Sequence, residues 1–136
     1  MREMAMRAMR TAGLVLLISS TGAAGTACAA PLAEIEVGAA AALILEKKVF
    51  VLDVREPSEY KSGHIAGSVL IPVGQVNARF EELLQYKDQP MLVVCGSGAR
   101  SAAAIGMLSK RGFSNLRNVK GGMDAWRGAK LPVARP

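Results

Sequence analysis

Cys95 is the residue whose type and surroundings most clearly suggest chemistry. It follows the apolar run Met91-Leu92-Val93-Val94 and opens the segment Cys95-Gly96-Ser97-Gly98-Ala99-Arg100-Ser101, which leads into the small-residue run Ala102-Ala103-Ala104-Ile105. This order predicts a strand, a tight corner and a helix, so that the sulfur faces the unpaired N–H groups at the helix start. Such N–H groups, together with a nearby arginine, lower the pKa of a cysteine and stabilise its thiolate. We therefore expect Cys95 to be a reactive nucleophile.

The alternative for Cys95 is a buried thiol that packs in the core at the end of a strand, a common position for a free cysteine. Three features of the loop favour the reactive interpretation. The Gly-x-Gly spacing lets the backbone curl around the sulfur, Arg100 supplies positive charge, and Ser97 and Ser101 are polar where a core would need apolar atoms.

The first residues have the pattern of a secretion signal that precedes the folded domain. A basic start is followed by the apolar stretch Leu14-Val15-Leu16-Leu17-Ile18 and by Ala27-Cys28-Ala29, a small-x-small cleavage pattern. The apolar stretch is too short to span a bilayer, which takes roughly 20 apolar residues. We expect a signal peptide over residues 1–29, export to the periplasm or an equivalent compartment, and no stable membrane insertion after processing. Lipid attachment to Cys28 is less favoured, because Gly25 stands where lipoproteins usually have a large aliphatic residue.

Cysteine and charge content exclude several classes of protein. The sequence holds two cysteines, and removal of the signal peptide leaves Cys95 alone, so an internal disulfide is not expected. The formal net charge is +6, but lysines and arginines are scattered, and the aromatic residues are only one Trp, two Tyr and three Phe. A nucleic-acid surface usually combines a basic stripe with aromatic residues, so we expect no nucleic-acid partner. The mild positive excess favours the approach of small anions.

Patterns of apolar residues predict one α/β domain without internal repeats. Aliphatic runs predict strands, and helical spacing or helix-start residues predict helices. The strands are expected at residues 49–54, 69–71, 91–94 and 116–119, and the helices at 37–48, 57–61, 76–84, 101–111 and 123–128. Strands that are apolar on both faces and separated by helices imply a mostly parallel sheet covered on both sides. Because ligands bind beyond the carboxyl ends of such strands, Asp53 and Cys95 should lie at the same edge.

Three parts of the sequence resemble one known family, in the expected order and spacing. They are Leu52-Asp53-Val54-Arg55-Glu56 with the following Gly63-His64-Ile65-Ala66-Gly67-Ser68 and Ile71-Pro72, the loop from Cys95 to Ser101, and Gly121-Gly122-Met123-Asp124-Ala125-Trp126. Together they resemble the rhodanese (sulfurtransferase) domain, and most closely its small exported single-domain members. The resemblance implies one rhodanese domain over residues 32–136, with a three-layer α/β/α fold and a mostly parallel central sheet of about five strands.

The resemblance also implies an activity, the transfer of sulfur by a covalent route. Cys95 would attack the sulfane sulfur of a donor such as thiosulfate, release sulfite and carry a persulfide, whose outer sulfur cyanide or a thiol would then take up. Backbone N–H groups of the loop would bind the transferred sulfur, and the residues concerned are Gly96, Ser97, Gly98, Ala99, Arg100 and Ser101. The expected partners are therefore a small anionic sulfur donor and a thiol or cyanide acceptor, and no metal or organic cofactor is required.

Asp53 and Arg55 are expected to support the loop rather than to react. A carboxylate beside the thiolate would raise the pKa of the thiol, so we expect Asp53 to be structural rather than catalytic. Arg100 is expected to brace the loop against Asp53 while adding positive potential. His64, the only histidine, lies in a different segment and is not expected to be a general base, because an ionised thiol has no proton to give.

Two other functions stay open at this point. The first is a rhodanese-like binding or sulfur-carrier module that turns over poorly. The second and less favoured is a cysteine phosphatase or arsenate reductase; in cysteine phosphatases of related fold the cysteine and arginine enclose five residues, whereas four separate Cys95 from Arg100. A shorter loop suits a single sulfur atom better than a phosphate group.

One departure from the family pattern concerns thiosulfate. Many thiosulfate-using relatives carry a basic residue just after the cysteine, where this chain has Gly96 and Ser97. The missing charge predicts weak binding of thiosulfate, with a KM toward or above the upper part of the usual range of ~1 μM to 1 mM.

Overall fold

The computed structural model describes residues 32–136, and the expected signal peptide with Cys28 lies outside them. Along the described chain the elements follow the order β1, α1, β2, α2, β3, η1, α3, η2, β4, α4, β5 and α5, where η marks a 3-10 helix. Within this part of the chain, no helix is both long enough and apolar enough to cross a membrane.

A five-stranded sheet with the order β1-β5-β4-β2-β3 forms the centre of the domain, and its paired strands all run parallel. The strands are β1 (Glu34–Ile35), β2 (Phe50–Asp53), β3 (Val69–Leu70), β4 (Met91–Val94) and β5 (Leu116–Val119). The middle strand, β4, is buried at every residue. Its unbroken aliphatic sequence follows from this position, because a strand covered on both faces needs no polar alternation.

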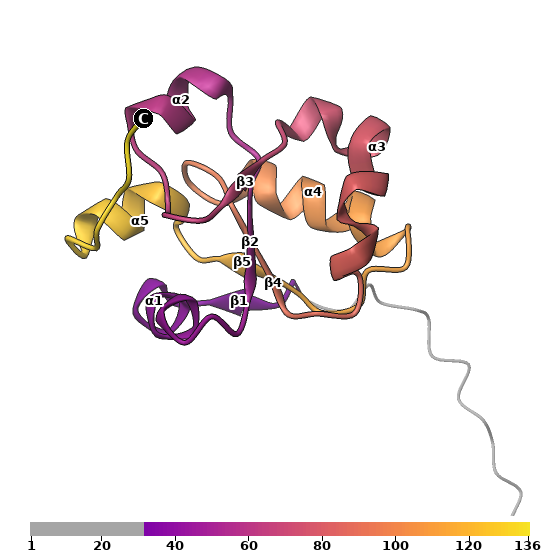
Figure 1. Ribbon diagram of the computed structural model, residues 1–136, viewed down its shortest axis with the longest axis horizontal. Coiled ribbons are helices and arrows are strands. Elements are labelled where there is room, and N and C mark those ends of the chain that lie inside the picture. The colour runs from indigo at the N-terminus through magenta and orange to yellow at the C-terminus, as the bar shows by residue number, and fades with distance from the viewer. Residues whose placement is uncertain (1–31) are drawn as a thin grey trace, which may run out of the picture.

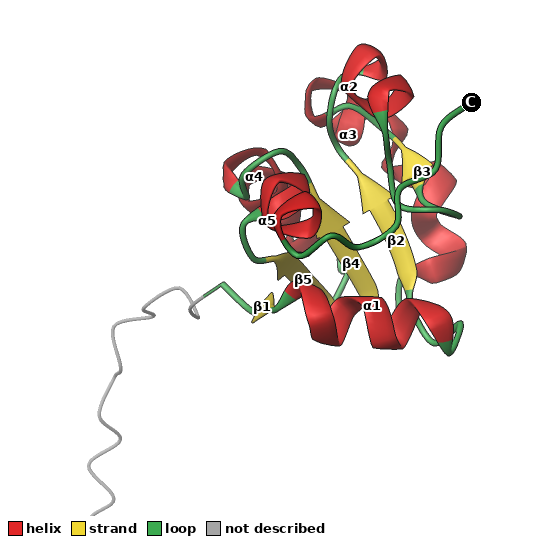
Figure 2. Ribbon diagram, turned by 90° about the vertical axis from the view of Figure 1, so that its left-hand side faces the viewer, coloured by secondary structure: helices red, strands yellow, loops and turns green. Residues whose placement is uncertain are grey.

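Helices cover both faces of the sheet and give the domain three layers (Figures 1 and 2). One face carries α1 (Val37–Leu45) and α5 (Gly122–Gly128), and the other carries α3 (Val76–Arg79) and α4 (Ala99–Ser109). Side chains of β4 alternate between the two cores: Leu92 and Val94 join the α1 and α5 side, whereas Met91 and Val93 join the α4 side. The expected α/β/α fold with a parallel sheet is confirmed.

The short helix α2 (Pro57–Ser62) follows the carboxyl end of β2, at the end of the sheet that also carries the cysteine loop (Figure 1). Proline in the first turn starts the helix without the loss of a hydrogen bond. Glu56 and Glu59 form a reciprocal capping box, in which each side chain accepts from the backbone N–H of the other. These local contacts fix the position of Glu59.

Three features of the fold differ from the sequence prediction. Strand β1 was not expected, because two residues are too short for a periodic pattern; pairing of Glu34 and Ile35 with β5 defines it. The helix expected over residues 76–84 is a single α-helical turn, α3, which continues as the 3-10 helix η2 (Phe80–Tyr86). A second 3-10 turn, η1 (Val73–Gln75), precedes α3.

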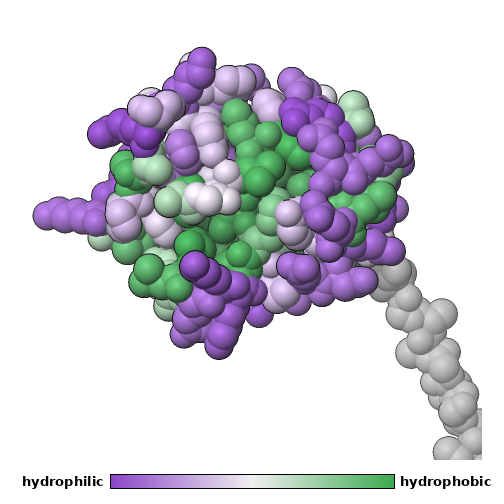
Figure 3. Space-filling model, in the orientation of Figure 1, coloured by the Kyte–Doolittle hydropathy of each residue, from purple (hydrophilic) through white to green (hydrophobic). Residues whose placement is uncertain are grey.

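The two edge strands of the sheet are short, and one of them lies near an apolar area of the surface. Figure 3 shows that apolar residues gather in the middle of the face seen in Figure 1, with hydrophilic residues around them. The middle of this view includes β3, an edge strand of two residues in which Val69 is 40% exposed. The other edge strand, β1, also has two residues. Both edges therefore offer little backbone for pairing with another chain.

Candidate active site

Cys95 directly follows the central strand β4, and the neighbouring strand β2 ends beside it. The register pairs Asp53 with Val94, so the two strand ends predicted to meet do lie at the same edge of the sheet. Cys95 is 1% exposed and belongs to the core cluster on the α4 side. The expectation that it does not pack in the core is therefore wrong. Strand alternation explains its position, because Cys95 continues the side-chain row of Met91 and Val93.

The sulfur of Cys95 is nevertheless in a polar setting. The backbone N–H of Gly98 donates to Sγ over 3.0 Å, and the hydroxyl of Ser101 lies 3.4 Å from Sγ. Gly98 is the N-cap of α4 and has a φ of 115°, a left-handed conformation that favours glycine. A side chain at Gly98 would strain this turn and move the N–H that donates to the sulfur.

These hydrogen bonds act on the ionisation equilibrium of Cys95 against the effect of burial. Burial raises the pKa of the thiol, but hydrogen bonds from the Ser101 hydroxyl and from the backbone N–H groups of Ser101, Gly98 and Ser97 lower it by more. The net pKa of Cys95 lies below its ordinary value. The loop therefore shifts Cys95 toward the thiolate, the direction that the sequence predicts, and amides and a hydroxyl supply the hydrogen bonds.

The first turn of α5 holds the other side of the loop. The backbone N–H of Met123 donates to the carbonyl of Cys95 over 2.7 Å, and that of Asp124 donates to the carbonyl of Gly96 over 2.9 Å. With these carbonyl oxygens bound on the α5 side, the following N–H groups are free to turn toward the sulfur. Gly122 lies so close to the loop that a Cβ there would collide with the carbonyl oxygen of Cys95.

The buried side chains of Ser101 and Asn118 form a hydrogen-bonded pair beside the Cys95 sulfur. The Ser101 hydroxyl lies within hydrogen-bond distance of the Gly98 carbonyl (3.0 Å), the Asn118 side-chain oxygen (2.5 Å) and the Cys95 sulfur. Asn118 also donates from Nδ2 to the Gly98 carbonyl over 3.1 Å. The hydroxyl has one proton for these three acceptors, and an ionised sulfur would attract it most strongly because the bond is then charge-assisted.

The guanidinium of Arg100 binds a residue of α2. Its Nη1 and Nη2 atoms donate to the two carboxylate oxygens of Glu59 over 2.7 and 2.8 Å. The hydrogen bonds to Arg100 outweigh partial burial and lower the pKa of Glu59 to about 2, and the same bonds raise the pKa of Arg100. The expectation that Arg100 braces the loop against Asp53 is wrong, because Asp53 has a different partner.

That partner is Arg55, and the two form a buried network under α2. Arg55 donates from Nε and Nη2 to both carboxylate oxygens of Asp53, over 2.8 to 3.1 Å, and from Nη2 to the carbonyl of Gly63 over 2.8 Å. Its Nη1 donates to the carbonyl of Glu59 over 3.2 Å. Arg55 thus ties the end of β2 to both ends of α2, and through Glu59 to Arg100 and the loop.

A family model decides what kind of domain carries this site. The model of the rhodanese-like domain matches residues 36–129, which include every strand except β1 and the whole cysteine loop. The chain belongs to the rhodanese-like family.

Relatives and solved structures agree with this assignment. The thiosulfate sulfurtransferase GlpE of Vibrio cholerae is 33% identical over 99 residues, which cover 73% of this chain and 92% of that protein. YrkF of Bacillus subtilis, named as a candidate sulfur carrier protein, is 40% identical over 83 residues, 61% of this chain and 44% of YrkF. A rhodanese-related protein of Thermoplasma volcanium superimposes with a TM-score of 0.70 at 36% identity, over 76% of this chain and 99% of that one.

Two residues of this rhodanese site were missed by the sequence analysis, Glu59 and Asn118. Glu59 stands three residues after Glu56 at the start of α2, a spacing that indicates a capping box but not a partner 41 residues away. Asn118 is buried in β5, where a polar residue near the carboxyl end of an inner strand was the available signal.

The only histidine belongs to another part of the domain. The ring of His64 stacks on Tyr60 with 3.7 Å between the ring centres, and its Nδ1 lies 2.9 Å from the Tyr60 carbonyl oxygen. Its backbone pairs with Ala134 near the carboxyl terminus. These contacts give His64 a place in the packing of α2 and the last residues of the chain.

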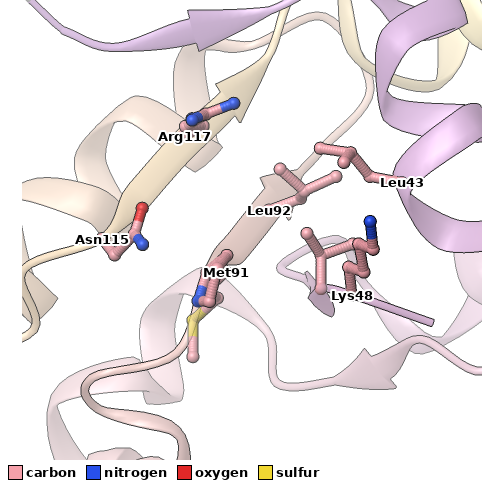
Figure 4. A pocket seen from close by; sticks show the side chains of 8 residues that line it. Leu43, Lys48, Met91, Leu92, Asn115 and Arg117 are labelled. Carbon is pink, nitrogen blue, oxygen red and sulfur yellow. The ribbon is translucent and has the colours of Figure 1, made fainter. Parts of the chain in front are cut away.

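The pocket in Figure 4 lies at the opposite end of the sheet from Cys95. It has a volume of about 210 Å³ and is lined by Leu43, Lys48, Val49, Pro90, Met91, Leu92, Asn115 and Arg117. Met91 is the first residue of β4, whereas Cys95 follows the last. The pocket is therefore separate from the rhodanese loop.

Proposed function

We propose that this rhodanese domain is a sulfurtransferase that carries a sulfane sulfur as a persulfide on Cys95. The hydrogen bonds on the Cys95 sulfur support this proposal most directly, because they favour the thiolate that must attack a donor. The named activity of GlpE supports the same class of reaction.

The first half of the reaction loads the enzyme. The Cys95 thiolate attacks the outer sulfur of a donor such as thiosulfate, and a new S–S bond forms while the S–S bond of the donor breaks. The bonding electron pair leaves with sulfite, so the step consumes no external oxidant or reductant. The negative charge moves to the outer sulfur of the persulfide, where the N–H groups of the loop can stabilise it as they would an oxyanion.

The second half returns the thiolate. A cyanide ion or a thiolate attacks the outer sulfur of the persulfide, and the electron pair of the broken S–S bond returns to Cys95. The burial of Cys95 favours small acceptors or an acceptor that displaces part of the loop. Two successive half-reactions through a covalent intermediate predict ping-pong kinetics.

Intact-mass measurement after incubation with thiosulfate tests the proposal. We expect the wild-type protein to gain the mass of one sulfur and to lose it on addition of cyanide, which becomes thiocyanate. The Cys95→Ser variant should gain nothing. A wild-type protein that accepts sulfur from neither thiosulfate nor any other sulfane donor contradicts the proposal.

A sulfur-carrier or binding module is the second candidate, and the burial of Cys95 favours it. Such a module would hold the persulfide and release it only to a protein that opens the loop. The name given to YrkF is consistent with this role. The two candidates separate in the same assay, because a carrier loads with sulfur but turns over slowly with free cyanide.

The proposal includes export of the protein, on the basis of the signal pattern over residues 1–29. Fractionation of cells should place the mature chain outside the cytoplasm, and its mass should show cleavage close to Ala29 or Ala30. A diacylglycerol adduct on Cys28 would instead identify a lipoprotein.

A further inference from the structure

The charge of the Cys95 loop is the feature that bears on the choice of donor. Residues 96–99 are Gly, Ser, Gly and Ala and carry no charged side chain. Arg100 is the one cation in the segment from Cys95 to Ser101, and it lies beside the loop: its Nη2 would be 3.1 Å from a Cβ placed on Gly96. What Arg100 binds therefore determines whether the site offers a positive charge to a donor.

Both carboxylate oxygens of Glu59 accept hydrogen bonds from the guanidinium of Arg100, over 2.7 and 2.8 Å. The carboxylate is itself held in place, because Oε2 accepts from the backbone N–H of Glu56 over 2.9 Å and the Glu59 carbonyl accepts from buried Arg55. The depressed pKa of Glu59 keeps it ionised at neutral pH. The ion pair therefore leaves the rim of the loop with no net side-chain charge.

Thiosulfate places unusual demands on such a site. It is a dianion, and its sulfonate end must come close to a thiolate and then leave as sulfite with two negative charges. Like charges at contact distance repel, and the repulsion is stronger near a protein surface than in bulk water. The Cys95 site has N–H groups for the transferred sulfur but a cation already paired with Glu59, so it is poorly suited to the far end of a dianion.

We propose that Glu59 sets the donor preference of this site by withholding Arg100, so that the enzyme prefers sulfane donors with one negative charge or none over thiosulfate. This inference rests on the proposed function. Organic thiosulfonates and thiol persulfides are donors of this chemistry. With a persulfide, Cys95 attacks the outer sulfur, the S–S bond of the donor breaks, and the electron pair leaves with a thiolate that takes up a proton.

A pair of donors that differ by one charge tests the inference. Thiosulfate and methanethiosulfonate both present a terminal sulfur on a sulfonyl group, but the second has a methyl group in place of one charged oxygen. We would measure kcat/KM for each at constant ionic strength, with cyanide as acceptor, and compare the ratio of the two values. General damage to the loop lowers both kcat/KM values by the same factor, because both donors react with Cys95, and so it leaves the ratio unchanged. The persulfide of 2-mercaptoethanol, which has no charged group besides the persulfide itself, distinguishes thiol persulfides from thiosulfonates as the better donor when a thiol is the acceptor.

Glu59→Gln is the decisive variant, because glutamine can keep the capping box while it removes the charge that neutralises Arg100. We expect the thiosulfate to thiosulfonate ratio to rise about tenfold, mainly through a lower KM for thiosulfate. Glu82→Gln is the matched control, since it breaks another two-bond ion pair, with Arg79, on η2. The control should leave the ratio at the wild-type value.

Three further outcomes test the inference and keep it separate from the proposed function. Adding Arg100→Gln to Glu59→Gln should abolish the gain, because the freed guanidinium causes it. An unchanged ratio in Glu59→Gln, while Cys95 still forms a persulfide, overturns the inference and leaves the proposed function intact. A wild-type enzyme that accepts sulfur from none of these donors overturns the proposed function instead.

Discussion

Two arginine–carboxylate pairs flank the short helix α2, and they differ in how much water reaches them. The side chains of Arg55 and Asp53 are 2% and 0% exposed, whereas those of Arg100 and Glu59 are 36% and 38% exposed. Both pairs make at least two hydrogen bonds between guanidinium and carboxylate. Only the first has given up its hydration, so losing one partner there leaves a buried charge without compensation.

The same chemical pair therefore serves two purposes in this domain. Asp53 and Arg55 are two residues apart and fix the turn that positions α2, so their contact is part of the fold. Glu59 and Arg100 are 41 residues apart and connect α2 to the rim of the loop. A partly exposed pair can be broken at small cost, and this makes it suited to adjusting the charge of a site.

The largest effect expected from this comparison comes from breaking the buried pair. Asp53→Asn replaces an acceptor oxygen with an amide that faces the donors of Arg55, and leaves the guanidinium charge buried. We expect the free energy of unfolding to fall by about 3 to 5 kcal/mol. Urea denaturation of the variant measures it. A loss no larger than that of Glu82→Gln, which breaks an exposed pair, would contradict a structural role for Asp53.

A smaller effect is expected from Ser101→Ala, which changes the pKa of Cys95 without touching either arginine–carboxylate pair. Ser101→Ala removes the hydroxyl that helps to lower the pKa of the thiol, so that pKa should rise. A higher pKa leaves a smaller fraction of thiolate at a pH below the pKa, so alkylation by a small reagent should slow several-fold. Alkylation rates measured against pH check this. Ser97→Ala is the control, because Ser97 is exposed and acts through its backbone N–H; an equal shift in both variants would refute the assignment to the hydroxyl.

The contrast between the two pairs also shows where sequence patterns stop being informative. Aliphatic runs and glycine positions were enough to predict four of the strands and the cysteine corner, because these depend on local periodicity. The central strand and its loop lie where they were expected. The two-residue strand β1 was missed because pairing with β5, rather than its own sequence, defines it.

The partner of Arg100 could not be predicted for a related reason. Asp53 and Glu59 are both carboxylates close in sequence to the end of β2, and local spacing does not choose between them. The choice depends on Arg55. Its guanidinium binds the Asp53 carboxylate and the Glu59 carbonyl, and the Glu59 carboxylate is left to bind Arg100 of the loop. The burial of Cys95 was within reach of the sequence, since it continues the two-residue alternation of Met91 and Val93.

Breaking the exposed pair should have a much smaller effect on stability than breaking the buried one. Arg100→Gln removes two hydrogen bonds to Glu59 at a site where both side chains are more than a third exposed. We expect a loss of under about 1 kcal/mol in the free energy of unfolding. The urea experiment used for Asp53→Asn measures it on the same scale. A loss as large as that of Asp53→Asn would mean that the pair supports the fold and does not merely adjust the site.

The smallest expected effect is the pH dependence that this exposed pair contributes. The pKa of Glu59 falls from 4.5 to about 2 in the folded chain, mainly through its hydrogen bonds to Arg100. A carboxylate with a depressed pKa binds fewer protons when folded than when unfolded, so its stabilising effect is fully present above pH 4.5 and disappears as the pH falls through about 2. Screening by water keeps the contribution within the range of under about 1 kcal/mol.

Stability curves between pH 5 and 2 isolate this contribution when variants are compared. The wild type should lose more stability than Glu59→Gln across this range, because the variant has no carboxylate to protonate at that position. The difference between the two curves should shrink markedly in an Arg100→Gln background, where Glu59 has lost the partner that does most to depress its pKa. A difference that persists at full size without Arg100 would assign the depressed pKa to the capping box with Glu56 rather than to the exposed ion pair.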